Sequence, residues 1–471
     1  MNKKSNIISI ILGSLGTLFV LTILFAGVMF LIAQKTKVED GSSIVADDNS
    51  DTDDNKAAEY NEDSRQVYSE TDELPVSEPG SQEKDDLVEI VEDPSLQGDP
   101  DNENESTENE GLAETGADEE DTDMITDEKI SAILSGMSLN DKICQMFIIT
   151  PEALTAADCV TRAGDATKAA LSEYPVGGLI YFAQNLESQS QTKEMLENTA
   201  KIADEINGLP IFLCVDEEGG KVSRCAEKID EPELENMYKY KDQGTEKASE
   251  NAHLIAGYLK ELGFNLDFAP VADTWSNPEN TVIGERAFSD DFAQTAELVS
   301  AAVSGFKDEG VLCCIKHFPG HGDTRADSHT QAAVTAKTLD QLAQQEYLAF
   351  RSGIDAGADM VMAGHITVST VTDEPASVSK EMITGQLRDK LGYSGVVITD
   401  ALNMKAVTDH YQGNELGVKC INAGVDILLM PADFKASLTG VREAVESGSI
   451  SEDRIDESVR RILKLKLKLT E

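Results

Sequence analysis

One short stretch of this sequence concentrates the side chains that could carry out acid–base chemistry. Residues 316–329, KHFPGHGDTRADSH, hold three of the chain's six histidines together with two aspartates. Asp327 and His329 are separated by one residue, so the carboxylate can fix the tautomer and orientation of the imidazole. Lys316 and His317 stand at the start of the stretch and can donate hydrogen bonds to hydroxyl groups. The pattern predicts a proton shuttle at His329 beside a site for a polar ligand.

A two-histidine metal site is the alternative interpretation of the same stretch. Histidines that bind zinc from a helix must project from one face of that helix. Proline and glycine interrupt this stretch, so no helix is predicted that could present His317, His321 and His329 together. The sequence therefore predicts no metal and no organic cofactor.

These residues must be positioned by regular elements, and the sequence predicts an alternation of strands and helices. Amphipathic stretches such as residues 190–206 and 246–263 separate short apolar runs. Eight such units predict an α/β fold with a single (β/α)8 TIM-type barrel. A doubly wound open sheet is the alternative, but TPEALTAADC after the first strand is not the glycine-rich loop that it would need. The predicted strand runs are residues 142–150, 176–183, 209–218, 264–273, 311–320, 359–367, 395–403 and 425–432.

Polar residues occur at the ends of these apolar runs rather than at random. In a parallel barrel the carboxyl ends of all strands meet at one mouth, where active sites are found. A single polar residue there could be a satisfied core group, but several converging ones indicate a binding pocket. The residues at predicted strand ends are Asp216, Asp273, Lys316, His317, His365 and Asp400.

The motifs resemble those of glycoside hydrolase family 3, and specifically its β-N-acetylglucosaminidase branch. That branch has the pattern K-H-F-P-G-H-G, four residues, then D-S-H, which residues 316–329 match in full. The resemblance continues through residues 215–224 (VDEEGGKVSR), 265–273 (NLDFAPVAD), 283–288 (IGERAF) and 398–404 (ITDALNM). It implies that residues 129–471 form the family's N-terminal-type catalytic barrel.

The resemblance also implies a role for each matching residue. Asp400 would attack the anomeric carbon of the sugar. His329, oriented by Asp327, would supply the proton to the leaving oxygen and later remove one from water. The residues implied to hold the sugar are Asp216, Arg224, Arg286, Lys316 and His317.

The implied activity is that of a retaining, exo-acting β-N-acetylhexosaminidase in peptidoglycan turnover, working through a covalent glycosyl-aspartate intermediate. Two departures from the family pattern are Lys221, where arginine is usual, and the lack of the β-glucosidases' additional C-terminal domain after the last strand. The alternatives are a β-glucosidase-like or phosphorolytic glycosidase of the same family, or a non-catalytic wall-binding protein. The last would be expected to have lost Asp400 or His329, and both are present.

The first 38 residues predict a membrane anchor. Residues 7–33 are almost wholly apolar and uncharged, long enough as a helix to cross a hydrocarbon layer of ~30 Å. A cleaved signal peptide is the alternative, but the run is longer than a usual signal core and no convincing cleavage site follows it. Lysines flank both ends, so their distribution does not decide the orientation. We expect a single-pass protein of the cell membrane with its catalytic domain outside the cytoplasm.

Residues 39–128 predict a disordered acidic linker. They are rich in Asp and Glu and poor in large apolar residues, so they cannot bury enough surface to offset the entropy of ordering. A flexible chain of this length spans about 50 Å, which would let the barrel work away from the bilayer. The remaining residues 129–471 still carry a net charge of −21, so we expect no nucleic acid partner, since phosphate backbones need a basic surface. The family resemblance implies a carbohydrate substrate that contains N-acetylglucosamine, such as cell-wall or chitin fragments. The oligomeric state is not predicted.

Overall fold

The computed structural model describes residues 127–324 and 333–470. Eight parallel strands follow one another around a barrel, each bonded to its neighbour in the order β10-β1-β2-β3-β4-β5-β7-β9. The barrel closes where the Thr399 amide donates to the Ile427 carbonyl at 3.0 Å, beside a parallel bridge between Ile398 and Ile427. The strands are β1 Phe147–Ile149, β2 Gly178–Ile180, β3 Phe212–Val215, β4 Leu266–Asp267, β5 Leu312–Phe318, β7 Met360–Ala363, β9 Val396–Thr399 and β10 Leu428–Leu429.

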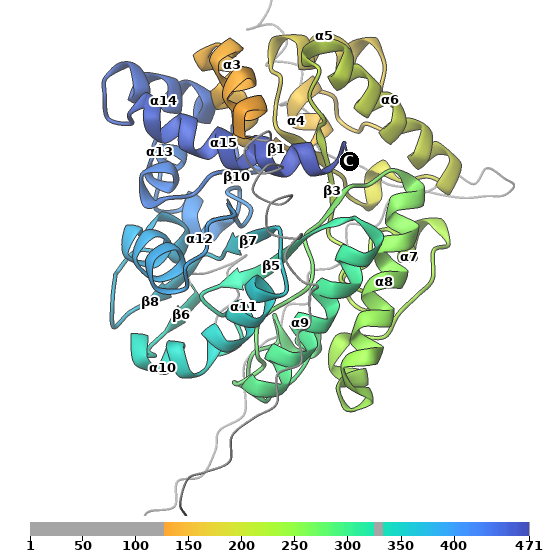
Figure 1. Cartoon of the computed structure of the whole chain (residues 1–471), viewed down its shortest axis with the longest axis vertical. Coiled ribbons are helices and arrows are strands. Elements are labelled where there is room, and N and C mark those ends of the chain that lie inside the picture. The colour runs from red at the N-terminus through yellow and green to blue at the C-terminus, as the bar shows by residue number, and fades with distance from the viewer. Residues whose placement is uncertain (1–126, 325–332, 471) are drawn as a thin grey trace, which may run out of the picture. The chain divides into compact units, whose positions relative to one another are not determined.

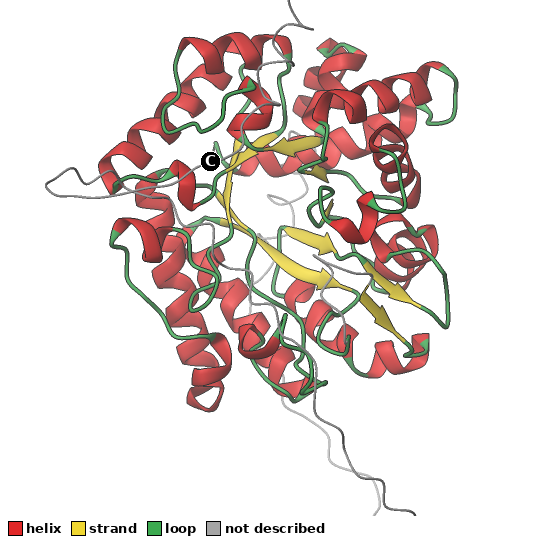
Figure 2. Ribbon diagram, turned by 180° about the vertical axis from the view of Figure 1, so that it is seen from behind, coloured by secondary structure: helices red, strands yellow, loops and turns green. Residues whose placement is uncertain are grey.

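Helices surround this sheet, as Figures 1 and 2 show. The predicted helical stretches 190–206 and 246–263 correspond to α6 Gln189–Asn207 and α8 Gly244–Leu262. Ser188 begins α6 by accepting the Gln191 amide on its side chain, and Gly208 ends it in a left-handed conformation. The other longer helices are α5 Asp165–Glu173, α9 Phe292–Glu309, α11 Glu346–Asp355, α13 Gly413–Ala423, α14 Phe434–Glu446, α15 Glu452–Lys468 and the π-helix η5 Glu381–Lys390.

Shorter elements join the strands to these helices. They matter for function because most of them lie in the connections that follow the carboxyl ends of the strands. The short elements are α3 Leu139–Gln145, α4 Pro151–Thr155, α7 Cys225–Ile229, α10 Leu339–Gln344, α12 Lys405–Thr408, η1 Ala183–Asn185, η2 Met237–Gln243, η3 Gly284–Arg286 and η4 Ala376–Val378.

The barrel prediction is confirmed for the described residues, and each of the eight predicted runs contains one strand of the barrel. The predicted start of the first strand was wrong, because residues 142–145 belong to α3 and β1 starts only at Phe147. A capping box between Ser138 and Asp141 starts that helix, so local capping outweighs the strand-like composition.

A second, two-stranded sheet was not predicted. The run 359–367 breaks after β7, and β8 Ile366–Val368 leaves the barrel to pair in parallel with β6 Ala333–Thr335. Strand β6 directly follows residues 325–332, which lie outside the described part of the chain. The described chain that follows that segment is therefore paired with the continuation of β7.

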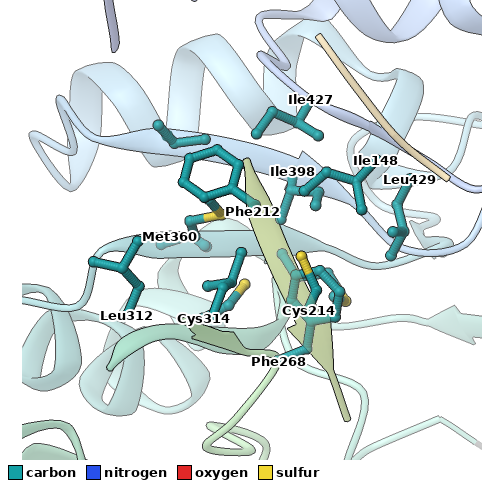
Figure 3. Packing of buried hydrophobic residues seen from close by; sticks show 14 of the residues in the cluster. Ile148, Phe212, Cys214, Phe268, Leu312, Cys314, Met360, Ile398, Ile427 and Leu429 are labelled. Atoms are coloured by element: carbon teal, nitrogen blue, oxygen red, sulfur yellow. The ribbon is translucent and has the colours of Figure 1, made fainter. Parts of the chain in front are cut away.

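The barrel interior is a continuous apolar core. Figure 3 shows side chains from opposite strands meeting there, among them Phe212, Cys214, Cys314, Met360 and Ile398, all of which are fully buried. Burying a side chain of this size stabilises the fold by about 1.5–3 kcal/mol relative to leaving it in water. This packed interior makes the strand ends a rigid base for the polar residues at the mouth.

The N-terminal predictions concern residues that the structure does not describe. The predicted anchor, residues 1–38, and nearly all of the predicted linker, residues 39–128, lie outside the described part of the chain. Among the helices of residues 127–324 and 333–470, none is both long and apolar enough to cross a membrane. Residues 127–136 are helical and place Ile130 and Leu134 in the barrel's core.

The amino-terminal end of the barrel holds a buried lysine that has no carboxylate partner within residues 127–324 and 333–470. Lys466 of α15 is 1 % exposed, and its Nζ donates to Gln145 Oε1 at 2.8 Å and lies 5.1 Å from the centre of the Phe212 ring. Gln145 precedes β1 and Phe212 begins β3, so α15 covers this end. Burial lowers the pKa of Lys466 to about 7.

We therefore expect the pH dependence of stability to include a contribution from Lys466. Because its folded-state pKa lies below the ordinary value, the unfolded chain binds more protons above pH 7, and the free energy of unfolding should rise with pH up to about 10.4. At pH 6 the free energy of unfolding of Lys466→Met should exceed that of wild type by about 1–3 kcal/mol. This difference should disappear by pH 10. Denaturant titrations at both pH values measure it, with exposed Lys193→Met as the control. An equal difference at both pH values would contradict the assignment.

Candidate active site

A polar cavity of about 290 Å³ opens at the carboxyl ends of the strands. Its lining combines charged side chains with apolar ones, among them Ile180, Met362, Met404 and Leu429. The structure places six of the sequence-predicted site residues on the wall of this single cavity. They are Asp216 after β3, Arg224 before α7, Arg286 in η3, Lys316 and His317 in β5, and Asp400 after β9.

A network of buried ion pairs forms part of the cavity wall. The Lys316 ammonium donates to Asp216 Oδ1 at 2.7 Å and lies 2.6 Å from Glu218 Oε1. The Arg286 guanidinium donates two parallel hydrogen bonds to Glu218, each of 2.8 Å. The side chains of Glu218 and Lys316 are 0 % and 3 % exposed, so the network is almost dry. Bidentate geometry of this kind fixes both direction and distance, and it holds the two cations at the edge of the cavity.

The network keeps its members charged despite burial. Burial alone would raise the pKa of Glu218, but the Arg286 and Lys316 cations lower that pKa well below the ordinary glutamate value. Burial likewise opposes the charge on Lys316, and the Asp216 and Glu218 carboxylates raise its pKa above the ordinary lysine value. Glu218 and Lys316 therefore keep their charges over the whole physiological pH range.

Glu218 is a functional residue that the sequence analysis missed. It lies two residues after Asp216, so in an extended strand end the two side chains point the same way. That spacing was the available signal. The sequence did not show that Glu218 would be the shared partner of Lys316 and Arg286, which come from separate segments of the chain.

Arg224 is held at the cavity by a neighbouring carboxylate. Glu217 Oε2 accepts the Arg224 and Cys225 amides at 2.5 and 2.8 Å, and Glu217 Oε1 accepts the Tyr258 hydroxyl at 2.9 Å. Burial raises the pKa of Glu217, and these hydrogen bonds oppose that rise. The Arg224 guanidinium lies 5.9 Å from the Phe182 ring centre, and its buried Nε has no hydrogen-bond partner among the described residues. This cation is available to a ligand.

His317 and His321 are fixed by one aspartate behind the cavity. Asp273 Oδ2 lies 2.7 Å from His317 Nδ1, and Asp273 Oδ1 accepts the His321 amide at 2.6 Å. The His317 ring therefore directs its Nε2 away from Asp273, and the cavity wall includes this ring. Burial lowers the pKa of His321. Asp273 was predicted at the mouth, and the structure places it one layer below.

Asp400 directly follows β9 and lines the cavity. Its amide donates to the Ala363 carbonyl at 2.8 Å, and its Oδ1 accepts the Ala401 amide at 2.7 Å. His365, the sixth residue predicted at a strand end, is buried behind this segment and does not line the cavity. Of the six predicted strand-end residues, four face the cavity and two support it.

The predicted proton shuttle lies outside the described residues, since Asp327 and His329 both fall within 325–332. The described residues on either side of this segment are joined directly. The Thr335 hydroxyl donates to Asp323 Oδ2 at 2.8 Å, and Lys337 forms an ion pair with buried Glu346. Within residues 127–324 and 333–470, no group of three or more His, Cys, Asp and Glu side chains is arranged to hold a metal ion.

The fold and the cavity define a (β/α)8-barrel protein with its polar site at the mouth where such barrels carry active sites. Residues 138–465 match the family model described as the glycosyl hydrolase family 3 N terminal domain, and the chain belongs to this family. The family prediction made from the motifs is thereby confirmed.

Named proteins and solved structures are similar to this chain. The chain is 35 % identical over 325 residues to Beta-hexosaminidase A of Pseudoalteromonas piscicida, covering 64 % of this chain but only 54 % of that protein. Beta-hexosaminidase LpqI of Mycobacterium tuberculosis is 31 % identical, with 70 % of this chain and 83 % of LpqI covered. A family 3 beta-N-acetylglucosaminidase structure from Paenibacillus sp. str. FPU-7 superposes with a TM-score of 0.67 at 36 % identity, covering 71 % and 63 % of the two chains. The chain thus spans about half the length of the first relative.

The ion network predicts different effects for its two carboxylates. Glu218→Gln leaves Lys316 and Arg286 without their shared buried charge, so we expect the free energy of unfolding to fall by about 3 kcal/mol. Asp216→Asn removes a carboxylate that is 20 % exposed, so we expect a loss of about 1 kcal/mol. Denaturant unfolding of both variants measures the difference. Equal losses would contradict the central place of Glu218.

Proposed function

We propose that the chain is a retaining, exo-acting β-N-acetylglucosaminidase that removes terminal, non-reducing N-acetyl-β-hexosamine residues. The observation that carries this proposal is the single cavity that brings Asp400 together with Asp216, Arg224, Arg286, Lys316 and His317. Its volume of about 290 Å³ suits one sugar ring, which favours cleavage of terminal residues. The names of the family relatives, beta-hexosaminidase and beta-N-acetylglucosaminidase, support the choice of sugar.

The first chemical step in this proposal forms a glycosyl-enzyme. An Asp400 oxygen donates an electron pair to the anomeric carbon while the bond to the leaving oxygen breaks, and that oxygen keeps the bonding pair. His329, oriented by Asp327, delivers a proton to the leaving oxygen. The backbone bonds of Asp400 to Ala363 and Ala401 hold the attacking carboxylate at the cavity wall.

The second step returns the enzyme to its starting state. His329 takes a proton from water, whose oxygen attacks the anomeric carbon and displaces the Asp400 carboxylate with its electron pair. Two inversions at the same carbon give net retention. Because a neutral imidazole repels anions less than a second carboxylate would, phosphate can compete with water as the acceptor.

We also propose that the enzyme works on the cell wall from a membrane anchor. The apolar residues 7–33 would form the anchor, and the acidic residues 39–128 would tether the barrel outside the cytoplasm, where peptidoglycan fragments with β-linked N-acetylglucosamine occur. Intact cells should then hydrolyse an added aryl substrate, and the activity should sediment with membranes. Activity found only after lysis, in the soluble fraction, would exclude this location.

The decisive test is an assay of the full-length chain with aryl substrates. We expect release of the aryl group from aryl β-N-acetylglucosaminide and little from aryl β-glucoside, with free N-acetylglucosamine as the product. The same reaction with added phosphate separates phosphorolysis, which would yield the sugar 1-phosphate. A preference for β-glucoside would favour the β-glucosidase-like alternative, and no turnover of either substrate would favour a wall-binding protein.

The nucleophile is tested by trapping it. A 5-fluoro-N-acetylglucosaminyl fluoride should label Asp400, because Asp400 displaces fluoride and the fluorinated intermediate hydrolyses slowly. Asp400→Asn should lose at least about 1,000-fold in kcat and all labelling, while product binding is kept, because the amide is nearly isosteric but cannot attack as an anion. Exposed Asp409→Asn, in the same connection after β9, is the matched control and should be unchanged. A label on another residue would refute the assignment.

The role of His329 is tested by the leaving group. His329→Ala should slow the first step most for poor leaving groups, since an activated phenol needs little protonation. Hydrolysis of the intermediate should suffer with every substrate, so an activated aryl substrate should give a burst of product. Asp327→Asn should cause a related, smaller loss by removing the charge that orients the imidazole. A uniform loss without a burst would instead indicate a binding role for His329.

A further inference from the structure

A buried histidine connects the segment that carries Asp400 to the rest of the mouth. His365, between β7 and β8, is 1 % exposed. Its Nε2 lies 3.0 Å from the Ala401 carbonyl oxygen, and its Nδ1 lies 2.8 Å from the Ser377 hydroxyl. Ala401 directly follows Asp400 and donates its own amide to the Asp400 carboxylate at 2.7 Å.

The chemistry of these partners fixes the tautomer of the ring. A carbonyl oxygen can only accept, so His365 Nε2 must carry the proton in the bond to Ala401. In the neutral imidazole Nδ1 is then an acceptor, and the Ser377 hydroxyl is its donor. The Ala401 carbonyl therefore selects the tautomer, and the Ser377 hydroxyl completes it by donating to Nδ1. Ser377 itself is fully buried in η4, and an antiparallel bridge between Thr367 and Pro375 ties the start of that turn to β8.

Backbone hydrogen bonds near His365 link the ends of strands β5, β7 and β9. Asp400 donates its amide to Ala363 at the end of β7, and the Gly364 amide donates to the Phe318 carbonyl at the end of β5 at 2.8 Å. A Cβ on Gly364 would come within 3.1 Å of His317 Cβ, so glycine permits this close approach. His365 thus lies between the strand of the sugar-binding His317 and the strand of Asp400.

We propose that His365 is a positioning residue, which through its bond to the Ala401 carbonyl aims the Asp400 carboxylate at the anomeric carbon. The inference rests on the proposed function. The Asp400 carboxylate accepts the backbone amide of Ala401, so a displacement of Ala401 would displace the carboxylate as well. Misplacing a reacting group by about 1 Å can cost about 100-fold in rate. In the proposed function the sugar is held by Arg286, Lys316 and the other charged cavity residues, whereas the His365 ring bonds to Ala401 and Ser377.

Two amide variants that differ by one methylene separate positioning from a merely structural role. In His365→Gln, the amide nitrogen can reach the place of Nε2 and donate to Ala401. In His365→Asn, the shorter side chain reaches only the place of Nδ1. We expect His365→Asn to lower kcat about 10–100-fold with KM within about threefold, and His365→Gln to keep kcat within about fivefold of wild type. Exposed His410→Asn is the control and should leave both constants unchanged.

The trapping reaction measures the attack by the nucleophile separately from the later hydrolysis of the intermediate. With 5-fluoro-N-acetylglucosaminyl fluoride, attack by Asp400 breaks the C–F bond and fluoride leaves with the electron pair. The rate constant of labelling should therefore fall in His365→Asn by the same factor as kcat, while the concentration for half-maximal labelling stays the same. Labelling of His365→Asn at the wild-type rate, or equal losses in the Asn and Gln variants, would overturn the proposal.

A further variant keeps the test decisive where His365→Asn does not fold. Ser377→Ala retains the imidazole and removes only the hydrogen bond that holds its Nδ1, so the ring is less firmly oriented and kcat should fall about 3–10-fold at unchanged KM. Full activity of Ser377→Ala beside an inactive but folded His365→Gln would overturn the inference. A wild-type chain that hydrolyses no N-acetylglucosaminide, or is labelled away from Asp400, would instead refute the proposed function.

Discussion

Two cations, Lys316 and Arg286, stand side by side at the barrel mouth, and the rest of the site depends on the carboxylates that make this possible. Taking a charge out of water costs several kcal/mol unless an opposite charge and hydrogen bonds compensate. Glu218 compensates for both cations, and Asp216 adds a second, partly exposed partner for Lys316. The residues that would bind a sugar are thus already held by each other before any ligand arrives.

Buried carboxylates also hold the connections that carry the site. Glu217 receives the backbone amides at the start of α7 and so places Arg224, while Asp273 receives the His321 amide and the His317 ring. Each carboxylate uses backbone donors that would otherwise be unsatisfied. The connections after β3 and β5 are therefore organised by hydrogen bonds from the strand ends beneath them, and the mouth is preorganised for a polar ligand.

At the opposite end of the barrel, Lys466 has a neutral partner instead, and burial shifts its pKa downward.

The mouth also joins the proposed catalytic elements across the sheet. Strand β8 continues from β7 past His365 and pairs with β6, which begins directly after residues 325–332. His365 meets the Ala401 carbonyl, and Asp400 bonds to the end of β7. The segment of the proposed nucleophile and strand β6, which follows the histidine motif in the chain, therefore share one support, the β7–β8 unit. A small displacement of that unit would change both at once.

The sequence by itself determined the family, the eight strands and the gathering of Asp216, Arg224, Arg286, Lys316, His317 and Asp400 at one cavity. It could do so because strand ends of a closed parallel barrel converge whatever the details of packing, and because the motifs are long. Only the tertiary structure decided that Glu218 is shared by Lys316 and Arg286, that His365 and Asp273 support the cavity instead of lining it, that β8 pairs with β6, and that Lys466 is buried. These depend on contacts between residues far apart in the chain, and neither side-chain type nor spacing specifies which charged groups will meet.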